Sequence, residues 1–270
     1  MALTIAILSQ KGGTGKTTMT RSLTDIFQRV GLQTLAVDGD PQGNLSDYFD
    51  TDPAAQPTLG EVLTGGARAV DAIHDGVIPA NLGLAEAELI LSGKMGRELT
   101  MRNALREAKR RYDAILIDCP PTLGLLTVNA LVAADRALLS AEAEYFSLQG
   151  VEQALEVVEL ARENLNPELE VLGIVLNIAN MRTNHARETL QTLHQHFPQT
   201  FETVIRRSIA YAESSERAIP ILDYRPDRGV DYLKLSAEIF ERLEMPEQLE
   251  RVEALATELA PDKDAAAGLN

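Results

Sequence analysis

Cysteine and long apolar runs are scarce in this 270-residue chain, and each absence excludes a class of protein. Cys119 is the only cysteine, which rules out an intrachain disulfide scaffold and a CxxC metal or redox site. No segment approaches the ~18–20 apolar residues that a membrane-spanning helix needs. The first residues, MALTIAILSQK, lack the basic region and the cleavage site of a secretory signal. We therefore expect a soluble, cytoplasmic protein.

Positive charge is also in short supply. The chain has 25 Lys and Arg against 40 Asp and Glu, a net charge of −15 and a pI of about 4.7. Phosphate backbones attract Lys and Arg, so this composition alone does not indicate nucleic-acid binding. The balance is uneven, because residues 182–234 contain eight Lys/Arg and seven Asp/Glu. The remainder of the chain therefore carries nearly all of the negative charge.

Short apolar runs alternate with longer helical patterns along the chain. The runs expected to form buried strands are residues 3–8, 34–37, 114–117, 136–140 and 171–176. The segments expected to be helical are residues 16–30, 123–134, 147–165, 187–196, 209–217 and 227–243, with an extended segment at 201–205. This alternation predicts an α/β fold with a mostly parallel, doubly wound sheet and helices on both faces.

A single domain is expected over residues 1–260, followed by a flexible tail over 261–270. Residues 51–96 are richer in Gly, Ala and Pro, and are predicted to add short helices and loops to the sheet. Ligands of doubly wound sheets bind at the carboxyl ends of the strands. The polar residues that follow each strand are therefore the first candidates for a functional site.

The segment after the first strand, residues 10–18, has the sequence QKGGTGKTT and opens a helix. Three glycines within four residues allow the backbone N–H groups to curl around phosphate oxygens, and the helix N-terminus adds positive dipole. In such a loop Lys16 reaches the β- and γ-phosphates, and the Thr17 hydroxyl binds Mg²⁺. The sequence thus predicts ATP and Mg²⁺ as ligands, bound by Gly12, Gly13, Thr14, Gly15, Lys16, Thr17 and Thr18.

Carboxylates follow two other strands. Asp38 and Asp40 lie in the segment VDGDPQGN, and Asp118 ends the run ILID. Carboxylates beside a bound nucleotide hold Mg²⁺ or orient a water, although the Asp, Gly, Pro and Asn of the first segment are also typical of a simple turn. The run of apolar residues that ends in Asp118 is a Walker B pattern.

Together these motifs resemble the ParA family of DNA-partitioning ATPases. Gln10 stands where the standard G-x-x-x-x-G-K-[ST] loop has its first glycine, and the form K-G-G-x-G-K-T-T resembles the deviant Walker A of ParA, MinD-type proteins and the nitrogenase iron protein. The resemblance covers nearly the whole chain and implies a three-layer P-loop NTPase fold. It also implies that Lys11 binds the nucleotide of the partner subunit in an ATP-dependent homodimer.

The resemblance supplies the roles of the charged residues. It implies that Lys11, Lys16 and Asp40 are catalytic, with Asp40 positioning the attacking water. It assigns Thr17, Asp40 and Asp118 to Mg²⁺, Asp118 acting through a water, and places Asp38 near the outer shell of the metal.

Two polar residues after later strands are further candidates. Asn177 follows the strand run 171–176, and its amide offers both a donor and an acceptor to the adenine edge, as in relatives; a turn residue is the alternative. Glu144 lies in a segment similar to the family's E-Y-x-x-L and is a candidate to face the dimer partner, or else belongs to an ordinary loop.

DNA contacts in this family come from basic residues of the C-terminal part. The corresponding candidates are Arg182, Arg187, Arg206, Arg207 and Arg217. The chain departs from the family's P-R-x-x-x-L-x-E-A-P stretch. Arg206 and Ser215 stand where the family has prolines, and Ala210 stands where many relatives have a second Arg. Surface arginines in ion pairs with the seven acidic neighbours are the alternative.

The resulting functional hypothesis is a weak ATPase that dimerises on ATP binding, binds DNA non-specifically at the nucleoid, and is released by a ParB-like or cargo-adaptor activator. One alternative is a nucleotide-dependent protein switch without DNA binding, which the acidic pI favours. Another is a MinD-like membrane-positioning ATPase, for which residues 247–259 are the candidate amphipathic helix, although their polar face is mainly acidic. A nitrogenase-like iron protein would need two cysteines per subunit.

Overall fold

The computed structural model describes residues 2–142 and 147–259. Within them one sheet contains six parallel strands in the order β3-β2-β4-β1-β5-β6. The strands are β1 Leu3–Leu8, β2 Thr34–Asp38, β3 Val77–Ile78, β4 Ala114–Asp118, β5 Arg136–Glu142 and β6 Glu170–Asn177. The predicted doubly wound α/β fold is thereby confirmed. Glu144 and the tail 261–270 lie outside the described residues.

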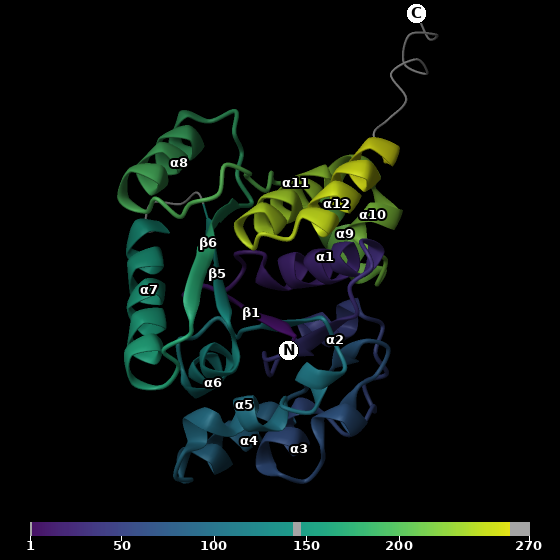
Figure 1. Cartoon of the computed structure of the whole chain (residues 1–270), viewed down its shortest axis with the longest axis vertical. Coiled ribbons are helices and arrows are strands. Elements are labelled where there is room, and N and C mark those ends of the chain that lie inside the picture. The colour runs from purple at the N-terminus through teal and green to yellow at the C-terminus, as the bar shows by residue number, and fades with distance from the viewer. Residues whose placement is uncertain (1, 143–146, 260–270) are drawn as a thin grey trace, which may run out of the picture.

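Helices cover both faces of the sheet (Figure 1). On one face lie α1 Lys16–Arg29, α9 Ala210–Glu216, α10 Ile221–Tyr224, α11 Pro226–Arg242 and α12 Pro246–Glu258. On the other lie α3 Leu59–Thr64, α4 Gly83–Ser92, α5 Thr100–Ala104, α6 Leu125–Ala133 and α7 Ser147–Asn164, joined by α8 Asn184–His196. The short helix α2, Asn44–Tyr48, follows β2, and the 3₁₀ turns are η1 Ala69–Ala72, η2 Arg97–Leu99 and η3 Ala108–Arg110.

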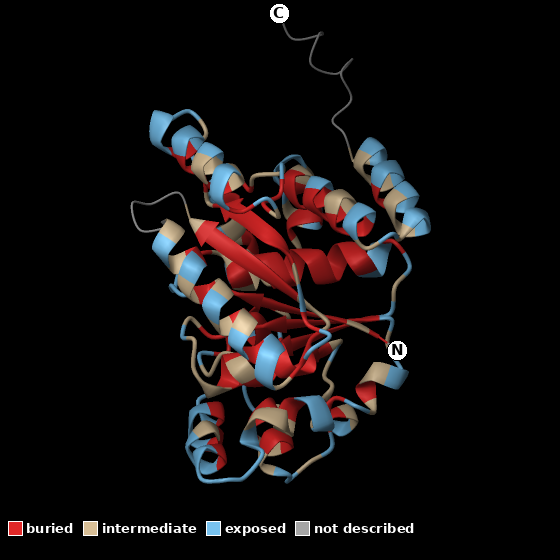
Figure 2. Cartoon of the chain, turned by 60° about the vertical axis from the view of Figure 1, so that its left-hand side comes forward, coloured by how far each residue is buried: buried red, intermediate tan, exposed pale blue. Residues whose placement is uncertain are grey.

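The strands are buried on both sides, which explains their continuous apolar sequences. Successive residues of β1 point to opposite layers: Ile5 and Ile7 pack under α1 and α11, and Ala6 and Leu8 under the other helices. Figure 2 shows the strands and most of α1 buried, whereas α8 and α12 keep an exposed outer face. Two core layers thus hold the carboxyl ends of the strands in one row.

The expected elements are found with two differences. β3 falls within residues 51–96, where only helices and loops were expected, and it adds an edge strand beside β2. Residues 201–205 run beside β6 but form no regular strand. The backbone N–H groups of Phe201 and Ile205 donate to the Ile174 and Leu176 carbonyls of β6 at 2.8 and 3.0 Å.

The C-terminal helix α12 has an apolar stripe that packs on the domain. Val252 is 1% exposed, and Leu249, Leu255 and Leu259 are half-buried against the core beneath α1 and α11. The Arg251 guanidinium donates to the Val30 carbonyl at 2.9 Å. Because this stripe is occupied, it is not available to enter a bilayer, which argues against the MinD-like alternative. None of the helices described in residues 2–142 and 147–259 combines the length and apolarity needed to cross a bilayer.

Candidate nucleotide-binding site

The loop between β1 and α1 has the backbone conformation of a phosphate cradle. Gly13 and Gly15 have φ angles of 78° and 77°, in the left-handed region that favours glycine. Gly15 is the N-cap of α1, so the free N–H groups of the first helical turn face the loop. The Lys16 ammonium donates to the Ser9 hydroxyl at 3.0 Å and to the Lys11 carbonyl at 3.3 Å, and so lies across the cradle.

A second layer of hydrogen bonds fixes this loop from behind. The Thr14 carbonyl accepts from Asn177 Nδ2 at 2.9 Å and from the Ser140 hydroxyl at 2.7 Å. A Cβ at Gly15 would lie 2.7 Å from Asn177 Nδ2, so glycine is required there for space as well as for its φ angle. Residues from the ends of β5 and β6 therefore hold the loop in shape.

Asn177 has a structural role that its sequence position did not reveal. Its side chain is buried, its Nδ2 also lies 3.3 Å from the Ser140 hydroxyl, and its Oδ1 accepts from the Ile178 N–H at 2.8 Å. The Asn177 side chain also has a hydrogen bond with Tyr232. Contact of Asn177 with adenine stays a prediction.

The first turn of α1 meets the end of β4. The Thr17 hydroxyl donates to Asp118 Oδ2 at 2.7 Å, and the Thr20 hydroxyl lies 3.3 Å from Asp118 Oδ1. Burial, and then the negative charge of Asp38, raise the pKa of Asp118 to about 7. The predicted pair of Mg²⁺ residues, Thr17 and Asp118, is thus brought together in a site that favours a nearby positive charge.

Asp38 and Asp40 have different surroundings although they lie two residues apart. Asp38 is fully buried; its oxygens accept from the backbone N–H groups of Asp40 and Ser46 and from the Ser46 hydroxyl. Burial raises the pKa of Asp38 to about 6. Asp38 therefore shapes the turn, and its place near the outer shell of the metal, beside Asp118, stays a prediction. Asp40 lines the open cavity beside Lys16.

The phosphate loop opens into a cavity of about 490 Å³. Thr17, Thr18, Asp40 and Pro121 border it near the loop, together with the loop glycines. Burial lowers the pKa of Lys16, against the attraction of Asp118. Burial also raises the pKa of the Cys119 thiol well above its usual range, so Cys119 is an unreactive core residue.

The donor set suits Mg²⁺ held partly by a bound nucleotide. In the described part of the chain no three His, Cys, Asp or Glu side chains cluster as a metal site. Mg²⁺ in nucleotide sites takes one or two protein oxygens, and phosphate and water oxygens complete its shell. The Thr17 hydroxyl and the carboxylates of Asp118 and Asp40 are the protein oxygens that would hold the metal.

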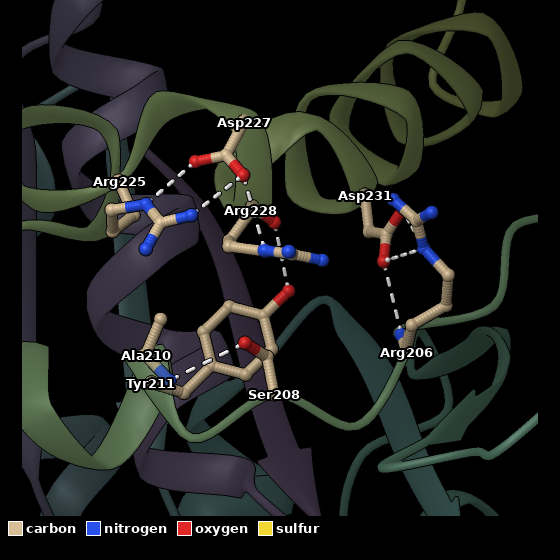
Figure 3. Close-up of polar contacts among 8 residues, drawn as sticks. All are labelled: Arg206, Ser208, Ala210, Tyr211, Arg225, Asp227, Arg228 and Asp231. Carbon is tan, nitrogen blue, oxygen red and sulfur yellow. Dashed lines mark hydrogen bonds and ion pairs between the residues drawn. The ribbon is translucent and has the colours of Figure 1, made fainter.

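Part of the cavity wall was missed by sequence reasoning. It is lined by Arg207, Ser208, Tyr211, Ser215 and Tyr232. The Tyr211 hydroxyl donates to the Arg228 carbonyl at 2.9 Å (Figure 3). The Tyr211 ring meets the Tyr232 ring edge-on, with 5.5 Å between the ring centres. Tyr211 stands in the stretch that was interpreted only for DNA, and Tyr232 in the helix predicted over residues 227–243, so no signal for a cavity was available without the fold.

Two of the arginines proposed for DNA serve other purposes in the structure. The Arg206 guanidinium and backbone N–H both donate to the carboxylate of Asp231, whose side chain is 7% exposed (Figure 3). Arg207 lines the nucleotide-sized cavity. Arg206 has this ion pair because α11 lies beside it and brings the Asp231 carboxylate from 25 residues further along the chain.

The other three candidates lie on the surface. Arg182 and Arg187 are exposed at and near the start of α8, and Arg187 Nε donates to the Met181 carbonyl at 3.0 Å. The Arg217 guanidinium lies 5.5 Å from the centre of the Tyr224 ring. These three residues are separated over α8 and the end of α9, and contact with DNA stays a prediction for them.

Lys11 extends from the first part of the loop. Its side chain is 64% exposed, and its ammonium lies 3.7 Å from a Glu142 carboxylate oxygen. Beside it, the Gln10 amide donates to the Gln153 side chain on α7. Lys11 is thus placed at the surface beside the loop, where a partner subunit has access to it.

Comparison with known proteins agrees with this geometry. A sequence profile described as an AAA domain matches residues 2–171. Sporulation initiation inhibitor protein Soj of Bacillus subtilis is 36% identical over 249 residues, which cover 88% of this chain and 98% of Soj. Chromosome partitioning protein ParA of Myxococcus xanthus is 36% identical over 248 residues, with 88% of each chain covered. A crystal structure of cobyrinic acid a,c-diamide synthase from Mycobacterium smegmatis, with a bound ATP analogue and magnesium, is 32% identical, with a TM-score of 0.74 over 81% of this chain and 93% of that one.

Proposed function

This chain belongs to the ParA/Soj family of partitioning ATPases, and we propose that it is an ATP-gated switch that dimerises on ATP binding and then binds DNA non-specifically. A partner protein that stimulates hydrolysis, of the ParB-like or cargo-adaptor kind, releases it. The observation that carries the proposal is the glycine cradle with Lys16 across it, joined to Thr17 and Asp118 at one end of a nucleotide-sized cavity.

ATP occupies the cavity with its phosphates in the cradle. Backbone N–H groups from Gly12 to Thr18 and the Lys16 ammonium bind the phosphate oxygens. Thr17, Asp118 and Asp40 hold Mg²⁺, which neutralises negative charge between the β- and γ-phosphates. The base lies against Tyr211 and Ser215, which line the cavity outside the cradle.

Asp40 orients the water that attacks the γ-phosphate. It is the carboxylate that lines the open part of the cavity, since Asp38 is enclosed by its own turn. A P-loop site with one water-positioning residue is slow until further positive charge arrives at the γ-phosphate. That is why the activity is proposed to be weak alone and to rise with a partner.

Lys11 supplies such a charge in the dimer. Its exposed position beside the cradle allows it to reach the nucleotide of a second subunit when two phosphate loops face each other. Dimer formation requires Lys11 to leave the neighbourhood of Glu142. In this scheme ATP binding and dimerisation depend on each other, which is the basis of the switch.

A switch that acts through protein contacts alone is the second candidate. It is favoured by ion pairing in the C-terminal third, where Arg206 is held by Asp231, and Arg225 and Arg228 share Asp227 (Figure 3). In each of these ion pairs a carboxylate competes with phosphate for the arginine.

The proposed ATP-dependent dimer is tested by measuring mass in solution together with ATP turnover. Asp40→Ala is expected to bind ATP, to lose turnover and to accumulate as a dimer, whereas Lys11→Ala is expected to bind ATP and remain a monomer. A monomeric Asp40→Ala protein at saturating ATP would contradict the scheme, as would unchanged turnover in that variant.

A further inference from the structure

The short helix α2 ends in Tyr48, a residue that none of the motifs involves. Its side chain is fully buried, and its hydroxyl forms a hydrogen bond with the Ser214 hydroxyl on α9. A buried tyrosine needs a partner for its hydroxyl, and here the partner comes from 166 residues further along the chain. The contact joins the helix that follows the Asp40 turn to a helix that carries part of the cavity wall.

The direction of this hydrogen bond follows from the other contact of Ser214. The Ser214 hydroxyl donates to the Ile219 carbonyl at 2.5 Å, and a serine hydroxyl has a single hydrogen. The Tyr48 hydroxyl is therefore the donor to Ser214. Burial raises the pKa of Tyr48 above its usual value, so the hydroxyl keeps the proton that it donates.

The carboxylate of Asp38 ties α2 to the Asp40 turn. One of its oxygens accepts from the Asp40 N–H at 3.1 Å. The other accepts from the Ser46 N–H at 2.8 Å and from the Ser46 hydroxyl at 2.7 Å. Ser46 lies on α2, two residues before Tyr48. Because one carboxylate holds both segments, the position of Asp40 depends on the orientation of α2.

Helix α9 presents one face to the cavity and a neighbouring face to α2. Tyr211 and Ser215 line the cavity, whereas Ser214 is fully buried. On a helix these three positions lie within about 100° of one another, so a base that packs against the first two also orients the third. The Tyr224 hydroxyl contacts α9 as well, through Glu213 at 3.0 Å, but it comes from α10 and has no part in the link to α2.

A cation from α1 holds the same end of α2. Arg21 is 9% exposed, and its Nε donates to the Tyr48 carbonyl at 3.3 Å. Its guanidinium carbon lies 4.2 Å from the centre of the Phe49 ring. Helix α1 begins at Lys16 in the phosphate loop. Tyr48 is thus the residue at which the phosphate-loop helix, the Asp40 turn and the cavity wall are joined.

We propose that Tyr48 is a positioning residue, through which the base of the bound nucleotide sets the position of Asp40. A base that fills the wall orients α9, and through Tyr48 it orients the Asp40 turn. A smaller base leaves α9 without this support, so the same triphosphate is bound but hydrolysed more slowly. The inference rests on the proposed function, in which the base lies against that wall and Asp40 orients the attacking water.

The test measures kcat and KM for ATP and for UTP, whose single-ringed base reaches less of the wall. Tyr48→Phe removes the hydroxyl and keeps the ring, and Tyr224→Phe is the matched control because it removes another tyrosine hydroxyl that is bonded to α9. Tyr48→Phe should lower kcat for ATP by about 2- to 10-fold, the factor that corresponds to one hydrogen bond, and leave KM for ATP the same within about twofold. Its kcat for UTP should be unchanged, and Tyr224→Phe should keep the ratio of the two kcat values.

Ser214→Ala removes the acceptor of the same hydrogen bond. It should lower the ratio of kcat for ATP to kcat for UTP, and adding Tyr48→Phe should lower that ratio no further. An equal loss of kcat for both nucleotides in Tyr48→Phe would show that the hydroxyl only stabilises the fold, and would overturn the inference while the ATPase activity stands. Equal kcat values for ATP and UTP in the unaltered protein would also overturn it. Hydrolysis of neither nucleotide would contradict the proposed function itself, and the inference with it.

Discussion

Replacement of Asp118 by asparagine is expected to stabilise the nucleotide-free protein, and more so as the pH rises. The pKa of Asp118 is about 7 in the folded protein, against 3.8 for an ordinary aspartate. Between these values the folded protein keeps a proton that the unfolded chain releases, so the stability of the protein falls as the pH rises through this window. An asparagine at this position has no proton to lose, so the variant is free of this dependence.

The size of the effect follows from the shift. A difference of about 3 pKa units corresponds to about 4 kcal/mol at most, which is an upper bound because a buried site relaxes around a charge. The amide oxygen of asparagine can still accept from the Thr17 hydroxyl, so little packing is lost. About two of these units lie between pH 5 and pH 7, so we expect the advantage of Asp118→Asn over the unaltered protein to grow by at most about 2–3 kcal/mol between pH 5 and pH 8.

The assay is urea unfolding of both proteins at several pH values, with EDTA and without nucleotide. The advantage of the variant should be smallest near pH 4, rise to about pH 7 and then level off. A difference between the two proteins that is the same at pH 5 and pH 8 would refute the reasoning about Asp118. The same variant is expected to lose Mg²⁺-dependent ATP turnover, because stability is gained at the expense of the metal site.

Three other substitutions test separate parts of the site. Lys16→Ala should abolish the thermal stabilisation by ATP. In the unaltered protein this stabilisation would be about 2.7 kcal/mol when ATP is at a hundredfold excess over Kd. A retained thermal shift would show that Lys16 does not bind the phosphates. Gly15→Ala should lower the free energy of unfolding by about 1–3 kcal/mol and weaken ATP binding, because Gly15 has a φ of 77° and the added Cβ would lie 2.7 Å from Asn177 Nδ2. The matched control for backbone strain alone is Gly65→Ala. Gly65 has a φ of 88°, and nothing lies within 4 Å of an added Cβ. Asp231→Asn should weaken ATP binding and lower the free energy of unfolding by about 1–2 kcal/mol, because it loosens Arg206 next to the cavity wall. An unchanged ATP affinity would show that this ion pair does not support the cavity.

Most of the sheet could be predicted because its strands are buried on both faces. Runs such as residues 114–117 are continuously apolar, and burial on both sides of a parallel sheet requires that pattern. β3 escaped prediction because Val77 and Ile78 are only two residues, within a segment rich in turn formers. Their pairing with β2 is a tertiary contact that no local pattern encodes.

The phosphate-binding end of the site was predictable, and the part of the cavity wall outside the cradle was not. The glycines, Lys16 and Thr17 lie within six residues, so their spacing alone encodes the cradle. The partners of Arg206 and Tyr211 come from α11, and only the fold brings Asp231 and Arg228 beside them.

The most direct test of the account is DNA binding by the Asp40→Ala protein with ATP and with ADP, across a salt series. The account predicts binding that requires ATP and weakens steeply with salt, because an ATP-bound dimer that cannot hydrolyse presents its cations to phosphate groups. Equal binding with ATP and ADP, or none with ATP at low salt, would contradict an ATP-gated DNA-binding switch.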